Sequence, residues 1–171
     1  MKKINEIKII EPKLHKDSRG FFFESYNKER FSKIIGREID FVQDNHSYSK
    51  KSTIRGLHYQ TDPFQQEKLI RVISGEVFDV AVDLRADSKT FGEWYGIYLS
   101  SENHKQLFIP KGFAHGFQVT SNFAEVVYKT SSYYSPNHEK TILYNDPDIN
   151  IKWPAKATVI SEKDLSGDRL K

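Results

Sequence analysis

The stretch Val77-Phe78-Asp79-Val80-Ala81-Val82-Asp83-Leu84 decides the fold class of this chain. Its large apolar residues occupy every second position and share one face, whereas Asp79 and Asp83 lie on the other face. Such alternation predicts a β-strand. Ser74-Gly75, immediately before it, predicts a hairpin turn that connects it to another strand over residues 68–73. The centre of the chain is therefore expected to be antiparallel sheet.

The same alternation, bounded by turn residues, recurs along most of the chain. Helix signals are few: residues 28–35 predict one helix that ends at Gly36, and residues 102–104 predict a single turn. Asp146-Pro147-Asp148 and Trp153-Pro154 indicate turns, so the C-terminal part is expected to be mostly loop. This pattern predicts an all-β fold, most simply a jelly-roll barrel with few short helices. Further strands are expected at residues 21–26, 41–47, 95–99, 106–109, 116–120 and 125–133.

The composition fits one soluble domain over residues 1–171. The chain has 12 Phe, 9 Tyr and 2 Trp, whose large side chains can build a core. The net charge of +3, from 26 basic and 23 acidic residues, is too balanced to indicate nucleic-acid binding. No apolar run approaches the roughly 20 residues needed to span a membrane. Without cysteine the chain has no disulfide or thiol nucleophile, which fits a reducing compartment, so a cytoplasmic protein is expected.

The segment Arg55-Gly56-Leu57-His58-Tyr59-Gln60 places a histidine close to an arginine in an expected strand. Histidine suits proton abstraction near neutral pH, and the planar guanidinium of arginine suits phosphate oxygens. The pair therefore points to proton chemistry on a phosphorylated small molecule, although a half-buried histidine packed in a sheet is the commoner case. In an ideal strand Arg55 and His58 would point to opposite faces, so a shared ligand requires a bulge at Gly56.

A second histidine motif, Pro110-Lys111-Gly112-Phe113-Ala114-His115-Gly116-Phe117, resembles half of the cupin signature. The other half normally supplies His-x-His and a glutamate as metal ligands, but here it reads His58-Tyr59-Gln60 with Glu67 downstream. Glutamine is a poor ligand for zinc or iron. The resemblance implies a cupin-like barrel that has lost its metal site, so no metal and no cofactor are expected. A remnant metal site of His58, Glu67 and His115, as in a metal-dependent cupin oxygenase, is the less favoured alternative.

Blocks along nearly the whole chain match one family in order. They are DSRGFFFE (17–24), QDN (43–45), IRGLHYQ (54–60), EKLIRV (67–72), GEVFDVAVDLR (75–85), SKTFG (88–92), PKGFAHGF (110–117), YK (128–129), YSP (134–136), NDP (145–147) and IKWP (151–154). In these blocks the chain resembles the dTDP-4-dehydrorhamnose 3,5-epimerase family. Any single block would be a weak signal, but so many in the same order make the resemblance specific.

This resemblance implies an isomerase that converts dTDP-4-dehydro-6-deoxy-D-glucose to dTDP-4-dehydro-L-rhamnose. Protons would leave C3 and C5, which flank the C4 carbonyl, through enolates and return on the opposite face. The family pattern implies His58 as the base and Asp164 as the carboxylate that orients it. Lys68 would stabilise the enolate oxygen, and Tyr128 would be the acid on the far face. From the strand pattern alone, Tyr128 would be a core tyrosine and Lys68 a solvated lysine.

The resemblance also implies which residues hold the substrate. Gln43 and Asn45 alternate in one expected strand, so both can face one cavity while Asp44 points away. The strand near residues 19–24 is expected to pair across a homodimer, in which each site can borrow residues from its neighbour. The expected substrate-binding residues are Arg19, Glu24, Gln43, Asn45, Arg55, His115, Tyr134, Glu139 and Lys163.

Two other functions stay open at the level of sequence. One is an epimerase that acts at a single carbon, or on a related nucleotide 4-keto sugar. The other is a non-catalytic cupin that binds sugar nucleotides. The sequence fixes neither the order of the two epimerisations nor the geometry of the oligomer.

Overall fold

The computed structural model describes residues 4 and 6–170, which form a mostly antiparallel β structure with two short α-helices. The all-β prediction is confirmed. Neither α-helix of this described part is long and apolar enough to cross a membrane. In chain order the elements are β1 (Lys8–Ile10), β2 (His15–Asp17), β3 (Gly20–Phe22), α1 (Lys28–Ile35), β4 (Gln43–Lys50), β5 (Ile54–Gln60), β6 (Lys68–Asp83), β7 (Trp94–Ser100), β8 (Gln106–Ile109), β9 (Phe113–Thr130), the 3₁₀ helix η1 (Pro136–His138), β10 (Glu139–Thr141) and α2 (Glu162–Leu165).

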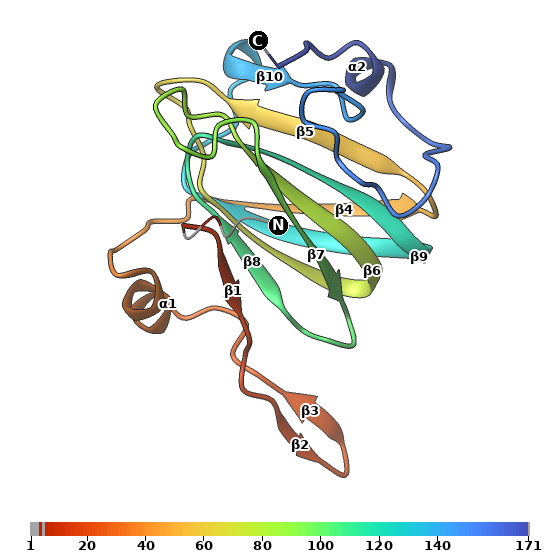
Figure 1. Ribbon diagram of the computed structural model, residues 1–171. Helices are drawn as coiled ribbons and strands as arrows, with labels where there is room; N and C mark the ends of the chain where they lie inside the picture. Colours follow the sequence, from red (N-terminus) through yellow and green to blue (C-terminus); the bar gives the residue numbers. More distant parts are fainter. Residues whose placement is uncertain (1–3, 5, 171) are drawn as a thin grey trace.

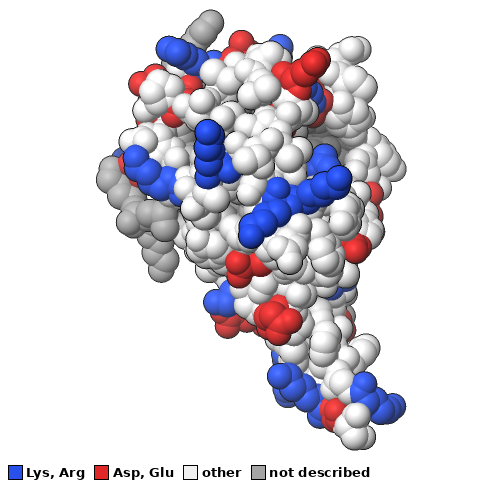
Figure 2. Space-filling model, turned by 90° about the vertical axis from the view of Figure 1, so that its right-hand side faces the viewer, with Lys and Arg blue, Asp and Glu red and all other residues white. Residues whose placement is uncertain are grey.

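One sheet of eight strands builds the body of the molecule. Its strand order is β1-β8-β6-β9-β5-β10, with β4 also paired to β9 and β7 also paired to β6. Figure 1 shows β5, β10 and α2 together at one end of this body. The hairpin of β2 and β3 forms a separate two-stranded sheet that projects from the opposite end (Figures 1 and 2). On this projecting hairpin, Phe21 and Phe22 are 57% and 71% exposed.

The prediction of a hairpin turn at Ser74-Gly75 is wrong, because β6 continues through these residues without reversing direction. Strand β6 pairs with β9 along its whole length, and the register shifts on both sides of residues 74–75. At the same break β6 changes its other neighbour, from β8 along residues 68–71 to β7 along residues 76–82. A β-bulge bends a strand in this way and lets it pass from one sheet layer to the next. Gly75 supplies the bend with a φ of +77°.

Other predicted strands are shifted or joined in the structure. The range 116–120 and residues 125–130 belong to one strand, β9 (Phe113–Thr130), which stays paired with β6 where β6 bends; residues 131–133, also predicted as strand, lie outside it. The strand predicted at residues 21–26 is only Gly20–Phe22, and the strand predicted at 41–47 is Gln43–Lys50. The strand at 106–109 is confirmed at both ends, and the strand predicted at 95–99 is one residue longer at each end.

The helix predicted at residues 28–35 is confirmed. The Asn27 side chain caps its first turn by accepting a hydrogen bond from the Arg30 amide, and Gly36 ends it with a φ of +83°. The turn expected at 102–104 is also present, closed by a hydrogen bond from the His104 amide to the Ser100 carbonyl. After β10 the chain is mostly loop, as predicted, until α2.

Residues 77–83 of strand β6 are buried on both faces. Phe78, Val80 and Val82 pack in one apolar cluster, whereas Val77 and Ala81 pack in another. The predicted alternation is therefore confirmed, and the face that carries the acidic residues also lies inside the molecule. A buried carboxylate needs partners, because burial without them costs several kcal/mol.

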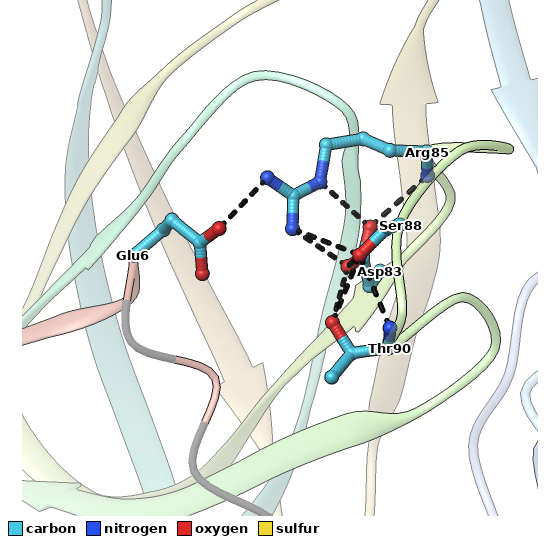
Figure 3. Close-up of polar contacts among 5 residues, drawn as sticks. All are labelled: Glu6, Asp83, Arg85, Ser88 and Thr90. Atoms are coloured by element: carbon cyan, nitrogen blue, oxygen red, sulfur yellow. Dashed lines mark hydrogen bonds and ion pairs between the residues drawn. The ribbon is translucent and has the colours of Figure 1, made fainter.

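Buried Asp83 ends β6 and organises the loop that leads to β7. Its carboxylate accepts hydrogen bonds from Arg85 Nε at 2.8 Å, from Ser88 Oγ at 2.6 Å and from Thr90 Oγ1 at 2.7 Å. Figure 3 shows these groups converging on Asp83, while Glu6 binds the far side of Arg85. Burial raises the pKa of Asp83, but these hydrogen bonds outweigh it and hold that pKa well below its usual range. Asp83 is thus a structural carboxylate that fixes the loop.

The bulge of β6 requires glycine at position 75, and this requirement can be tested by substitution. An alanine there would place its Cβ on the carbonyl oxygen of Phe123, at a φ that alanine resists. We expect Gly75→Ala to lower the free energy of unfolding by roughly 3 kcal/mol. Urea unfolding followed by circular dichroism measures this change.

Gly36→Ala is the matched control for that variant. Gly36 also has a positive φ, of +83°, but a Cβ there meets nothing within 4 Å. Its cost should be the conformational one alone, about 1 kcal/mol. Equal losses in the two variants would show that close packing against β9 is not what selects glycine at position 75.

Candidate active site

A cavity of about 310 Å³ opens between β4, β5, β6 and β9, with β10 and Tyr134 at its margin. Its wall is polar, with two histidines, one lysine, one arginine and one glutamate among the lining residues. The lining residues are Gln43, Asn45, Ser47, Arg55, His58, Tyr59, Gln60, Gln66, Lys68, His115, Phe117, Tyr128, Tyr134 and Glu139. Most of the residues predicted to bind or transform the substrate thus meet in one place.

His58 is paired with a buried carboxylate. Its Nε2 atom lies 2.6 Å from Oδ1 of Asp164, whose side chain is 4% exposed. The other carboxylate oxygen accepts a hydrogen bond from the Gly56 amide, and Ser161 caps the short helix α2 that carries Asp164. Burial raises the pKa of Asp164, but the hydrogen bonds from His58 and Gly56 outweigh it, so this pKa is lowered. An ionised Asp164 fixes Nε2 of His58 as the protonated nitrogen and leaves Nδ1 as an acceptor.

The bulge predicted at Gly56 is confirmed. The register between β5 and β9 shifts between Arg55 and His58, and Gly56 has a φ of +119°. As a result Arg55 and His58 both line the cavity. Arg55 stays exposed at its rim, where Nε donates to Ser49 Oγ at 2.8 Å and Nη2 donates to the Tyr48 carbonyl at 3.2 Å. The remaining N–H groups of the guanidinium can meet a bound anion.

His115 forms a second buried pair, with a residue that the sequence analysis did not assign to the site. Its Nε2 atom lies 3.0 Å from both carboxylate oxygens of Asp79, which is fully buried. Burial lowers the pKa of His115, although Asp79 acts in the opposite direction. His115 is therefore neutral near pH 7. The signal for Asp79 was an acidic residue on a strand whose other face is entirely apolar, but the pattern does not say whether that face meets solvent or a cavity.

Lys68 is a buried cation at the start of β6. The residue is 8% exposed, and its ammonium lies 5.9 Å from the ring centre of Tyr128. Burial lowers its pKa to about 8, while Asp79 and Glu139 oppose that change. Because Lys68 lines the cavity, its ammonium can donate hydrogen bonds to a ligand there.

Tyr128 lies on β9, next to Lys68. The two strands pair Ile70 with Tyr128, and the tyrosine ring also makes an edge-on contact with His115 at 6.4 Å between ring centres. Burial raises the pKa of Tyr128. The phenol is therefore protonated near neutral pH and can serve as a hydrogen-bond donor or an acid.

A polar network lines the margin of the cavity where β4, β10 and α2 approach. Gln43 and Asn45 share the inner face of β4 and are joined by a hydrogen bond of 2.9 Å, whereas Asp44 points outward, as predicted. The hydroxyl of Tyr134 donates to Glu139 at 2.7 Å, and Lys163 pairs with the same carboxylate. Burial raises the pKa of Glu139, but Lys163 and Tyr134 outweigh it and lower this pKa.

Two predicted substrate-binding residues lie away from the cavity within one chain. Arg19 is on the projecting hairpin, where it pairs with Asp17, and its side chain is 87% exposed. Glu24 pairs with Arg30 beside α1. Their role in substrate binding stays a prediction, because it depends on a second copy of the chain.

The alternative metal set is not assembled. Glu67 is bound to Arg37, and His58 is bound to Asp164. Within residues 4 and 6–170, no three His, Cys, Asp or Glu side chains form a cluster suited to a metal ion. The amide of Gln60, at the position of a cupin's second histidine, is hydrogen-bonded to backbone groups of neighbouring loops.

Comparison with known proteins agrees with this geometry. A family profile described as dTDP-4-dehydrorhamnose 3,5-epimerase matches residues 1–171. The chain belongs to the dTDP-4-dehydrorhamnose 3,5-epimerase family. It is 53% identical over 167 residues to the protein of that name from Shigella flexneri, covering 98% of this chain and 92% of the relative. The members of this family are isomerases, so the predicted enzyme class is confirmed.

Solved structures confirm the cupin-like jelly-roll fold. One is the dTDP-6-deoxy-D-glucose-3,5-epimerase of Legionella pneumophila in complex with dTDP-4-keto-L-rhamnose. It has a TM-score of 0.95 and 50% identity, with 99% of this chain and 90% of that chain covered. Another is ChmJ, a 3'-monoepimerase from Streptomyces bikiniensis in complex with dTDP-quinovose. Its TM-score is 0.91 and its identity 31%, with 96% and 84% covered. The fold thus supports both single and double epimerisation.

The pairing of His58 with Asp164 leads to a prediction for catalysis. In Asp164→Asn the amide can present its N–H to the ring, so the tautomer that offers Nδ1 as an acceptor loses its support. We expect kcat to fall roughly 10²–10⁴-fold, as when the carboxylate behind a catalytic histidine is neutralised. Steady-state epimerase assays measure this loss.

Glu162→Gln is the matched control, because Glu162 lies two residues earlier on the same helix and is exposed. It should leave kcat unchanged and keep the same thermal midpoint as the parent chain. A loss of activity in both variants would mean that α2, and not the Asp164 carboxylate, is what the reaction needs.

Proposed function

We propose that this protein converts dTDP-4-dehydro-6-deoxy-D-glucose to dTDP-4-dehydro-L-rhamnose by inverting C3 and C5. The observation that carries the proposal is the His58–Asp164 pair on the wall of a cavity that also holds Lys68 and Tyr128. A base, a cation and a phenol are the three groups that an epimerisation through an enolate requires. We infer that one epimerase domain spans residues 1–171.

In this proposal His58 is the base. Its free Nδ1 removes the proton at C3 or C5, each of which is acidified by the neighbouring C4 carbonyl. The imidazolium that forms is stabilised by the Asp164 carboxylate at 2.6 Å. Because Asp164 is buried and its pKa is lowered, this negative charge is already present before the proton moves.

Lys68 stabilises the enolate and Tyr128 returns the proton. The buried ammonium of Lys68 can donate to the C4 oxygen as it gains negative charge, and in a site of low dielectric that contact is strong. Tyr128 is protonated in the resting site and delivers its proton to the face opposite His58. His115, neutral and held by Asp79, supplies a further contact to the sugar.

The nucleotide end of the substrate would lie along the network of Gln43, Asn45 and Tyr134. Tyr134 is half exposed and offers a ring face for the base, while Glu139 and Lys163 add polar contacts. Arg55 at the rim of the cavity meets the charge of the diphosphate.

We also infer a homodimer in the cytoplasm. The projecting hairpin carries exposed Phe21 and Phe22 beside Arg19, a composition that suits insertion against a second copy. Such a pairing would bring Arg19 and Glu24 to the neighbouring site and so account for both residues. A chain without cysteine is compatible with a reducing compartment.

Proton exchange in deuterated water tests the proposal directly. The parent enzyme should introduce deuterium at both C3 and C5, because each position passes through an enolate. His58→Ala should abolish exchange at both carbons while dTDP still binds. Label at one carbon only would favour the single-carbon epimerase, and no label with intact dTDP binding would favour a non-catalytic cupin.

Tyr128→Phe separates the two proton-transfer roles in the same assay. With His58 intact, the substrate proton should still exchange with solvent, but inversion should be lost because no acid protonates the opposite face. Inversion at the parental rate in this variant would remove Tyr128 from the mechanism.

The pKa of Lys68, lowered to about 8, makes a prediction for pH dependence. Lys68 is charged below that pH and neutral above it, so kcat should fall on the alkaline side with an apparent pKa near 8. In Lys68→Arg the guanidinium stays charged, so the residual activity should lose this alkaline decline. An unchanged alkaline limb in that variant would assign the ionisation to another group.

A further inference from the structure

Gln60 occupies the cavity wall at the end of β5, where a cupin keeps a metal ligand. It is 6% exposed, and every polar function of its side chain is engaged. Its Nε2 donates to the carbonyl oxygens of Phe64 at 3.0 Å and Tyr133 at 3.2 Å. Its Oε1 accepts from the Ser135 amide at 2.7 Å. The side chain therefore ties β5 to two loops at once.

The loop that Gln60 holds carries Tyr134. The amide of Tyr134 donates to Oε1 of Gln43 at 3.0 Å, between the two backbone groups that Gln60 binds. Three consecutive residues, 133–135, are thus fixed by two glutamines from β4 and β5. Tyr134 is 50% exposed, so these backbone contacts, together with the hydrogen bond from its hydroxyl to Glu139, determine where its ring lies.

We propose that Gln60 is a positioning residue for the nucleotide: it acts through residues 133–135 to hold Tyr134 at the cavity margin. This rests on the proposed function, in which Tyr134 contacts the base of the substrate. A primary amide suits the position because it combines two donors with an acceptor in one plane. Glutamate would still accept from Ser135 but would set a carboxylate against two carbonyl oxygens. Histidine would offer one donor where two are needed.

The inference predicts a separation between binding and chemistry. In Gln60→Met the three hydrogen bonds are lost without adding charge, and the side chain keeps its length. We expect the Kd for dTDP and the KM for the sugar nucleotide to rise about tenfold. By contrast, kcat and its pH profile should stay within about threefold of the parent, because His58, Asp164 and Lys68 keep their partners.

A double-variant cycle tests whether Gln60 acts through Tyr134. Tyr134→Ala removes the ring, so adding Gln60→Met to it should raise the Kd for dTDP by less than twofold more. Full additivity of the two losses would overturn the proposal, as would a lower kcat or a shifted pH profile with unchanged Kd. Calorimetry with dTDP measures Kd without turnover, so this result is distinct from a failure of the proposed epimerisation.

Gln118 provides a control for a buried glutamine elsewhere. Its amide bonds both backbone groups of Ala155, and it does not line the cavity. Gln118→Met should lower the thermal midpoint but leave the Kd for dTDP at the parental value. Should Gln60→Met not fold, Gln60→His, which keeps one of the two donors, is the second variant, and its Kd for dTDP should also rise. Equal Kd changes in the Gln118 and Gln60 variants would show a general loss of packing and would overturn the proposed role.

Discussion

Strands β6 and β9 pair antiparallel from Lys68 to Asp83, and the rest of the site depends on this pairing. Strand β6 carries Lys68 and Asp79, and strand β9 carries His115 and Tyr128. Their register places Ala81 opposite His115 and Ile70 opposite Tyr128, so both ends of the cavity wall are set by one ladder. Because a shift of one residue would turn every side chain to the other face, the ladder tolerates no slip. At the bulge of residues 74–75, β6 passes from pairing with β8 to pairing with β7 while it stays paired with β9.

Around this ladder, the charged groups of the cavity are held by partners from other elements. Asp164 holds His58, Asp79 holds His115, and Lys163 and Tyr134 hold Glu139. Such pairs remove the cost of burying polar groups and fix their orientation before a ligand arrives. Lys68 differs, since its ammonium lies 5.9 Å from the ring centre of the aromatic residue Tyr128. The two histidines are therefore fixed in orientation by carboxylates, while the buried ammonium of Lys68 brings positive charge to the same cavity.

The sequence predicted local structure well where a short pattern determines it. The helix at 28–35, the strand at 106–109 and the bulge at Gly56 are each set by nearby residues. Ser74-Gly75 misled for a physical reason: the same dipeptide suits a tight turn and a bulge, and only pairing with β9 decides between them. Glycine in a strand pattern is a sign of a bulge as well as of a turn.

The site was predicted mainly from the family pattern and only partly from chemistry. Nothing in the local sequence of Asp164 marks it as buried, since it lies in a charged segment and gains its role from contact with β5. Asp79 was visible as an acid on a buried strand but could not be assigned to His115, which is 36 residues away. Local sequence patterns predict single strands and helices, but they do not predict contacts between segments that are far apart in the chain.

His58 and Asp164 are 106 positions apart in the chain, so they are synthesised at different times. Strands β4, β5, β6 and β9, which build most of the cavity, all precede α2 in the chain. A ribosome therefore releases the walls of the cavity before it releases the carboxylate that orients the histidine. The pair of His58 and Asp164 can therefore form only after α2 has left the ribosome, when the strands around the cavity have already been synthesised.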